Sequence, residues 1–253
     1  MQRRHIALFP LALLLVACAE GTWNLNVWGE EYIATGIPSE VFDDGCSVTF
    51  SDFRIPIQSI SLLDGNGEAL TTQTLNSRLQ LVEQAPQPLV TVQQPAGRYP
   101  VVKVVTGPVS GDDPGALEVA GVLQCGQRSA SFAWRFEPVT TYLCEPENLV
   151  IPANGEAETQ LTVHGDHLFY DSLEDPAAAV RGEPLLNADA DLDGTLTQAE
   201  LEAVSLAQLG YDVGRYSEVA NLWQFVSFLT QSLGHIDGEG HCAVTLSAPE
   251  SSE

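Results

Sequence analysis

Six residues in one short stretch are spaced as the ligands of a calcium ion would be. Ca²⁺ is a hard cation that takes about six to eight oxygen ligands at roughly 2.3–2.6 Å. The residues that offer such oxygens are Asp189, Asp191, Asp193, Thr195, Thr197 and Glu200. Gly194 stands between the third and the fourth, where the chain must turn sharply. The stretch therefore predicts a calcium loop, although an acidic solvated turn before a helix has a similar composition.

This spacing resembles the calcium loop of the EF-hand family. The resemblance implies carboxylate ligands from the three aspartates, the backbone carbonyl of Thr195, a direct or water-mediated contact from Thr197, and two oxygens from Glu200. Thr197 and Glu200 also form a capping box, so we expect a helix to begin inside the loop. Pro184 leaves room for about one helical turn before the loop. The single loop therefore looks like the structural calcium site of dockerin-like modules.

Four histidines gather in two short motifs that are rich in glycine and acidic residues. The motifs are His164-Gly-Asp166-His167, after an expected strand, and His235-Ile-Asp237-Gly-Glu239-Gly-His241, after an expected helix. Neutral imidazole binds Zn²⁺ and Cu²⁺ readily, and nearby carboxylates ligate such metals or orient the rings. We therefore predict a copper or zinc site formed by His164, Asp166, His167, His235 and His241.

The alternative to metal binding is a structural role for these histidines. Single histidines often cap turns and bind backbone carbonyls. The spacing also differs from the H-E-x-x-H motif of zinc peptidases, so it identifies neither a metal nor a reaction.

Four cysteines follow the N-terminal segment, and an even number indicates two disulfides in an exported protein. We favour the pairs Cys46–Cys125 and Cys144–Cys242 among the three possible pairings. The second pair would tie the C-terminus to the last strands of the β-rich part and carry the second histidine motif towards the first. A thiolate metal site is the rival, but the chain lacks any C-x-x-C spacing.

The N-terminus has the pattern of an export signal. Two arginines precede an apolar run, Ile6–Val16, which is too short to span a bilayer. Leu15-Val16-Ala17-Cys18 then resembles the lipobox of bacterial lipoproteins. The resemblance implies a signal peptide over residues 1–17, a lipid anchor in the membrane on Cys18 and, with Ala19 next, an outer-membrane lipoprotein of the bacterial cell envelope. A plain secretory signal is the alternative.

The chain is strongly acidic. It has 34 Asp and Glu against 10 Lys and Arg, a formal net charge of −24 over 253 residues. Nucleic acid and anionic membrane surfaces are therefore excluded as electrostatic partners. We interpret most of this negative charge as favouring solubility; the alternative is that it attracts cations.

Short β-rich runs separated by Gly and Pro turns occupy the middle of the chain. The expected strands are Ser47–Ile60, Leu79–Glu83, Leu89–Val92, Arg98–Thr106, Leu117–Leu123, Ser129–Glu137, Thr140–Cys144 and Thr159–Val163. We expect a bulge or sheet edge at Pro56, a hairpin tip at Asp64–Gly67, and the side chains of Phe132, Trp134 and Phe136 on one face.

Helical spacing follows these strands, over Thr197–Leu209 and from a cap at Ser217 to Gly234. The predicted fold is α+β. After a leader over residues 18–45, an antiparallel β-sandwich spans 46–163, and a small helical segment over 164–253 carries the calcium loop and the histidine motifs.

Three functions fit these residues. The first is a calcium-stabilised, lipid-anchored protein that binds a transition metal for storage, delivery or sensing. The second is a metal-dependent hydrolase with Asp166 or Glu239 as base. The third is a cell-surface interaction module with structural calcium only, whose partner is an envelope protein. We place binding first, because the sequence has no G-x-S-x-G elbow, phosphate loop or dinucleotide motif.

Overall fold

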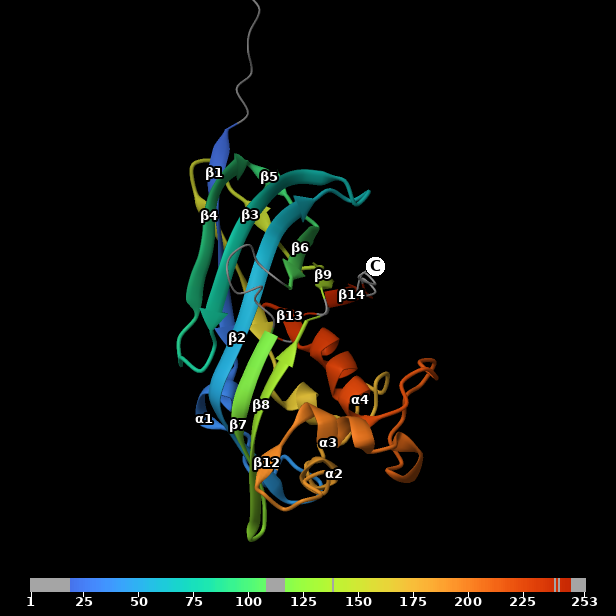
Figure 1. Cartoon of the computed structure of the whole chain (residues 1–253). Helices are drawn as coiled ribbons and strands as arrows, with labels where there is room; N and C mark the ends of the chain where they lie inside the picture. Colours follow the sequence, from blue (N-terminus) through green and yellow to red (C-terminus); the bar gives the residue numbers. More distant parts are fainter. Residues whose placement is uncertain (1–18, 108–116, 138, 239, 241, 247–253) are drawn as a thin grey trace, which may run out of the picture.

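The computed structural model describes residues 19–107, 117–137, 139–238, 240 and 242–246, and it is rich in β-structure (Figure 1). About 50% of the described residues are in strands or bridges and about 15% are in helices. The strands are β1 (Glu20–Gly29), β2 (Cys46–Leu63), β3 (Ala69–Gln80), β4 (Gln87–Pro95), β5 (Gly97–Arg98), β6 (Val101–Thr106), β7 (Leu117–Cys125), β8 (Arg128–Phe136), β9 (Thr140–Cys144), β10 (Val150–Ile151), β11 (Glu156–Val163), β12 (Thr195–Leu196), β13 (Gly234–Ile236) and β14 (Cys242–Leu246). The α-helices are α1 (Glu31–Thr35), α2 (Glu183–Leu186), α3 (Gln198–Ala203) and α4 (Leu222–Leu229).

Three short 3₁₀-helices complete the elements of the described residues. They are η1 (Asp166–Phe169), η2 (Leu206–Gln208) and η3 (Thr230–Ser232). No helix in the described part of the chain is long and apolar enough to cross a membrane.

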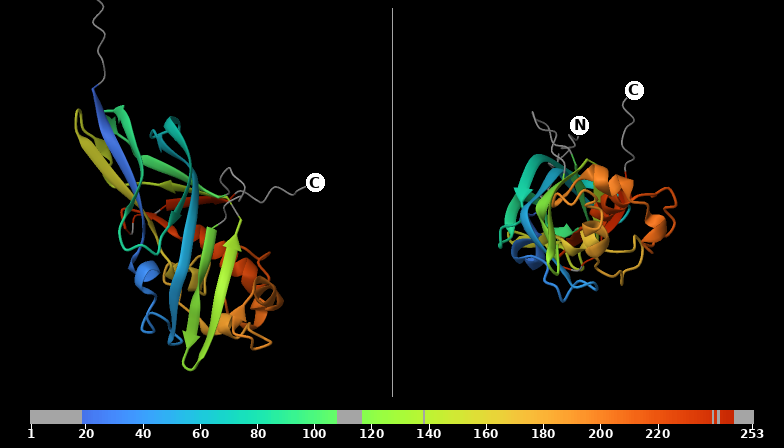
Figure 2. Two further views of the ribbon diagram at one scale, coloured as in Figure 1. Left: turned by 60° about the vertical axis from the view of Figure 1, so that its left-hand side comes forward. Right: turned by 60° about the horizontal axis from the view of Figure 1, so that its bottom comes forward.

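Two sheets organise the molecule. The smaller has the order β13-β11-β1-β4, and the larger runs β12-β8-β7-β2-β6-β9-β14, with β3 also paired to β2. The two short strands β5 and β10 form a separate pair. Figure 2 shows the helices between residues 198 and 229, coloured orange to red, on one side of the large sheet. Both sheets and these residues contribute to one apolar core.

The long strand β2 changes its neighbour halfway along. Its first half, Cys46–Arg54, pairs with β7, and its second half, Ile57–Leu63, pairs with β6. Pro56 lies at this change, and its ring nitrogen cannot donate a ladder hydrogen bond. The pairing register shifts directly afterwards, between Ile57 and Ser59. The expected irregularity is therefore confirmed, and so is the β2–β3 hairpin around Asp64–Gly67.

Strand β8 presents an aromatic face to the C-terminal residues. Phe132, Trp134 and Phe136 are all at most 3% exposed, as their alternation predicted. Phe136 stacks on Trp223 of α4, with ring centroids 4.8 Å apart. The indole nitrogen of Trp134 donates to the carbonyl oxygen of Leu196 at 3.0 Å. Leu196 and helix α4 therefore cover part of the apolar side of the large sheet.

The predicted fold class, an antiparallel β-sandwich followed by a small helical segment, was wrong in its second half. The described residues between 164 and 246 contain only short helices, and three strands from this range join the sheets: β12 beside β8, β13 beside β11, and β14 beside β9. The pairs β1–β11 and β12–β8 are also parallel. Short apolar runs have no period of their own, so the partner strand decided their conformation.

The two predicted helices are shorter than their apolar spacing suggested. Helix α3 ends at Ala203, because Ser205 and Asn221 form a β-bridge that takes both segments out of helical geometry. Helix α4 begins after Asn221, whose side-chain oxygen accepts a hydrogen bond from the Gln224 amide at 2.9 Å. Ser217 is therefore not the cap. Tertiary pairing overrode local helix propensity here.

Both expected disulfides are present. Cys46 bonds to Cys125 and Cys144 bonds to Cys242. Each pair joins directly opposed residues of neighbouring antiparallel strands, β2 with β7 and β9 with β14. The second bond thus holds the last described strand on the large sheet.

Gly121 allows a close approach that generates a stability prediction. A Cβ atom at this position would lie 2.2 Å from the carbonyl oxygen of Thr49 and 2.9 Å from Cζ of Phe132. We expect Gly121→Ala to lower the free energy of unfolding by about 2 kcal/mol, because backbone and a packed ring must move. Urea unfolding monitored by circular dichroism measures this change.

Gly65 provides the matched control for this experiment. It lies in the β2–β3 turn with open space around its Cβ position and without a positive φ. Gly65→Ala should be neutral or stabilise by up to about 1 kcal/mol. Equal effects of the two substitutions would contradict the packing that the structure gives to Gly121.

Candidate metal centre

The parallel strands β1 and β11 end side by side and bring Glu30 next to His164. Strands β1 and β11 run parallel, and their last residues, Gly29 and Val163, lie opposite each other. Glu30 and His164 directly follow these strands, and the Glu30 amide donates to the Val163 carbonyl at 3.1 Å. The parallel register therefore makes neighbours of two residues that are far apart in the sequence.

His164 is held by the carboxylate of Glu30. Its Nδ1 lies 3.2 Å from Oε2 of Glu30, and the histidine is only 5% exposed. A carboxylate beside Nδ1 favours the tautomer that leaves the lone pair on Nε2. The carbonyl oxygen of Gly238 is 3.4 Å from Nε2, which is too long for a strong hydrogen bond. Carboxylate–histidine pairs of this kind orient metal ligands.

The one-turn helix η1 carries the second histidine. Nδ1 of His167 lies 2.8 Å from the carbonyl oxygen of Ser232. A carbonyl oxygen only accepts hydrogen bonds, so Nδ1 carries a proton and the lone pair of the neutral ring is on Nε2. Gly165, before η1, permits this position, because a Cβ there would lie 2.7 Å from Cγ1 of Ile33.

The third histidine comes from β13. This strand pairs with β11, with His235 opposite Thr162 and Gly234 opposite Val163. The His235 ring is centred 4.5 Å from that of His164 and 5.3 Å from that of His167, and the last two are 5.1 Å apart. The two sequence motifs therefore meet, and three imidazoles form one cluster.

Two carboxylates share this cluster. Ligand atoms of His164, Asp166 and His167 all lie within 4.8 Å of one another. Donors around a tetrahedral zinc ion are about 3.4 Å apart, so small side-chain movements would enclose an ion. Tyr170 donates its hydroxyl proton to Oδ2 of Asp166 at 3.2 Å.

The second oxygen of each carboxylate is buried without a donor. Among the described residues, neither Oε1 of Glu30 nor Oδ1 of Asp166 has a hydrogen-bond partner. Burial raises the pKa of the Glu30 carboxyl, and the hydrogen bond and charge of His164 oppose the shift. Asp166 raises the pKa further, both by repulsion and by a side-chain hydrogen bond that forms when one of the two carboxyls is protonated. A buried carboxylate oxygen without a donor costs free energy that a bound cation would offset. Imidazole nitrogens with carboxylate oxygens suit Zn²⁺ or Cu²⁺.

The rest of the second histidine motif adds no ligand among the described residues. The predicted ligand His241 and the candidate base Glu239 lie outside the described residues. Asp237 uses its carboxylate to accept the Gln160 amide at 2.8 Å, so it has a structural role. Glu30 was missed by the sequence analysis. The alternation of Trp23, Leu25 and Val27 indicates a strand before it, but nothing in the sequence pairs that strand with β11.

The predicted calcium loop is a separate acidic site. Oxygen atoms of Asp189, Asp191 and Asp193 lie within 4.8 Å of one another. Asp189 is 7% exposed and accepts the amides of Asp193 and Gly194 at 3.1 and 3.2 Å. Gly194 has a φ of +79°, which suits the sharp turn. The three aspartates therefore converge as the spacing predicted.

The remaining loop residues begin the next helix. The Thr197 hydroxyl caps α3, and Oε2 of Glu200 accepts both the amide and the hydroxyl of Thr197 at 2.9 and 2.8 Å. These hydrogen bonds lower the pKa of the Glu200 carboxyl. The capping box is therefore confirmed, but Glu200 is outside the three-aspartate group. Thr195 donates its amide to Asp193 and pairs with Ser131 of β8.

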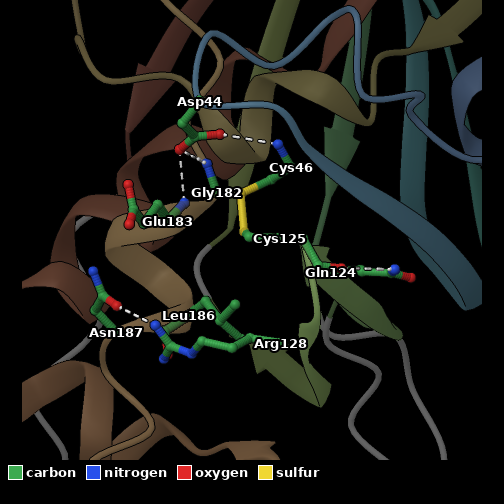
Figure 3. Close-up of a disulfide and its surroundings, with 10 residues drawn as sticks. Asp44, Cys46, Gln124, Cys125, Arg128, Gly182, Glu183, Leu186 and Asn187 are labelled. Atoms are coloured by element: carbon green, nitrogen blue, oxygen red, sulfur yellow. Dashed lines mark hydrogen bonds between the residues drawn. A yellow bond between two sulfur atoms is a disulfide. The ribbon is translucent and has the colours of Figure 1, made fainter.

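Helix α2 precedes the loop and is held by hydrogen bonds at both ends, which Figure 3 shows. Oδ2 of Asp44 accepts the amides of Gly182 and Glu183 at 2.8 and 2.7 Å, beside the Cys46–Cys125 disulfide. At the other end, Arg128 donates to the Leu186 carbonyl and to the Asn187 side chain. The one-turn helix that was expected before the loop is therefore anchored at one end to the turn before β2 and at the other to the first residue of β8.

No protein family, curated protein or solved structure matches this chain. The chemistry of the two sites therefore rests on their own residues.

Glu30 gives a sharp test of the three-histidine cluster. We expect Glu30→Gln to weaken Zn²⁺ binding about 10–100-fold, because the neutral amide accepts a weaker hydrogen bond from His164 and contributes no negative charge. The exposed neighbour Glu31 provides the control, and Glu31→Gln should bind Zn²⁺ as the parent protein does. Competition titrations against a zinc-sensitive dye measure both affinities. Equal affinities for the two variants would remove Glu30 from the site.

Proposed function

We propose that this protein is an exported, lipid-anchored metal-binding protein that holds a transition metal, zinc or copper. The ligands are His164, Asp166, His167 and His235, with His241 as a further candidate. The observation that carries the proposal is the meeting of three imidazoles with two buried carboxylate oxygens that lack donors. A solvated turn or a capping histidine would require no such convergence.

A second, structural metal ion is proposed for the loop over residues 189–200. The three converging aspartates and the left-handed Gly194 support Ca²⁺ there. Glu200 would turn one oxygen from Thr197 towards the ion, and Thr197 would keep its own hydroxyl bond to the helix. The ion would then fasten α2 and α3 to each other and, through β12, to the large sheet.

Export and anchoring are proposed from the N-terminal residues. The apolar run Ile6–Val16 and the sequence Leu15-Val16-Ala17-Cys18 support a lipoprotein signal with Cys18 as the lipidated residue, in a bacterial outer membrane. The two disulfides agree with an oxidising compartment. If Cys18→Ser protein still sediments with membranes after a salt wash, the lipid anchor is refuted.

The transition-metal site is tested by elemental analysis of protein purified without a tag from a periplasm. We expect about one zinc or copper ion per chain in the parent protein. His167→Ala/His235→Ala should lose that ion and keep calcium, because both rings leave the cluster while the loop is untouched. Retention of the transition metal by the double variant would overturn the three-histidine site.

Calcium binding is tested at Glu200. We expect Glu200→Gln to weaken Ca²⁺ binding at least about tenfold, because one carboxylate ligand is lost. Glutamine at this position keeps the capping box, so the helix should remain folded. The exposed Glu202 is the control, and Glu202→Gln should leave the affinity unchanged. Isothermal titration calorimetry with CaCl₂ would show the difference, and identical curves would exclude the loop as the site.

A further inference from the structure

A cleft of about 490 Å³ opens beside the three-histidine cluster. His167 and His235 form part of its wall, whereas the buried His164 does not reach it. Strand β14, the end of α4 and the loop over residues 172–176 supply other parts of the wall. The volume is in the usual range of small-molecule sites. A molecule in the cleft would therefore meet the metal from the side of His167 and His235.

Aromatic rings line this cleft. The rings of Tyr216 and Phe228 are centred 4.8 Å apart, and both residues are half-buried. The Tyr170 ring is centred 4.4 Å from the His167 ring. The guanidinium of Arg215 lies over Tyr216, 5.1 Å from the ring centre. The wall of the cleft thus contains the aromatic side chains of Tyr170, Tyr216 and Phe228.

The charged side chain of Arg215 contributes less to ligand selectivity in the cleft than the aromatic rings do. Nε of Arg215 is 3.0 Å from Oε1 of Glu174, and the Arg215 side chain also donates to the Tyr216 hydroxyl at 3.0 Å. The guanidinium is therefore already paired and also helps to fix the Tyr216 ring. The strongest attraction for a polar group in the cleft would come from the metal ion itself.

We propose that the cleft binds a small aromatic molecule whose oxygen group coordinates the metal while its ring packs against Tyr216 and Phe228. This inference rests on the proposed transition-metal function, because the oxygen group needs the ion as its partner. The three described histidines and Asp166 supply the protein ligands, and the cleft is the route by which an outside ligand joins them. The protein then recognises a metal–ligand pair rather than a bare ion.

Two hydroxamates test this proposal on the mature protein loaded with Co²⁺. Acetohydroxamate and benzohydroxamate share the chelating oxygens and differ in a methyl against a phenyl group. Visible absorption of Co²⁺ reports coordination of either probe. We expect both to change the spectrum and benzohydroxamate to bind roughly tenfold more tightly, because its ring contacts the aromatic wall.

Three variants test which residues make benzohydroxamate bind more tightly than acetohydroxamate. Phe228→Leu keeps an apolar side chain and removes the ring, so the two hydroxamates should bind with equal affinity. Tyr216→Leu should have the same effect and serves where Phe228→Leu does not fold. Trp223→Leu is the control, because Trp223 lies on the same helix but stacks on Phe136 outside the cleft. Thermal melting verifies the fold of each variant.

The outcomes separate the two proposals. If the parent protein retains no Co²⁺, the metal centre itself is wrong. If it retains Co²⁺ and neither hydroxamate changes the spectrum, the cleft is not the route to the metal. If both hydroxamates bind with equal affinity, or if Trp223→Leu removes the preference as fully as Phe228→Leu, the aromatic wall does not select the ligand.

Discussion

The parallel pairing of β1 with β11 is the constraint on which the metal centre depends. Trp23, Leu25 and Val27 of β1 are fully buried between the two neighbouring strands and the core. A slip of one residue would turn these side chains to the solvent side, at a cost of about 1.5–3 kcal/mol for each. The hydrophobic pattern of β1 therefore fixes the register, and the register fixes Glu30 beside His164.

The same sheet controls the third histidine. Strand β13 adds to the other edge of β11, which places His235 within ring contact of His164. The following strand, β14, is then tied to β9 by its ladder and by the Cys144–Cys242 disulfide. The cluster is thus built at strand ends whose positions are set by pairing on both sides. Such support holds ligands in place without a bound ion.

The calcium loop is supported in a different way. Helix α2 before it is held by Asp44 and Arg128, and β12 within it pairs with β8. Glu200 is bound by Thr197, so the helix cap and the ion would draw on the same carboxylate. The loop therefore has local order of its own, and an ion would add to that order rather than create it.

The sequence by itself determined what depends on local spacing and alternation. It placed the three-aspartate loop, the capping box, most strands from β2 to β9 and the aromatic face of β8. Its two preferred disulfide pairs are also the ones formed. The loop, the cap and the strands follow from the geometry of a turn and the period of a strand, which act over a few residues. The cysteine count limited the disulfides to three possible pairings, and the structure formed the preferred one.

Only the tertiary structure decided which strands meet. It made a central strand of the segment before Glu30, turned parts of residues 164–253 into sheet edges rather than helices, and chose Asn221 over Ser217 as a cap. It also added Glu30 to the histidines and opened the aromatic cleft beside them. Parallel pairing between distant segments gives no local signal in the sequence. Its free energy comes from burial and hydrogen bonds that exist only when both strands are in place.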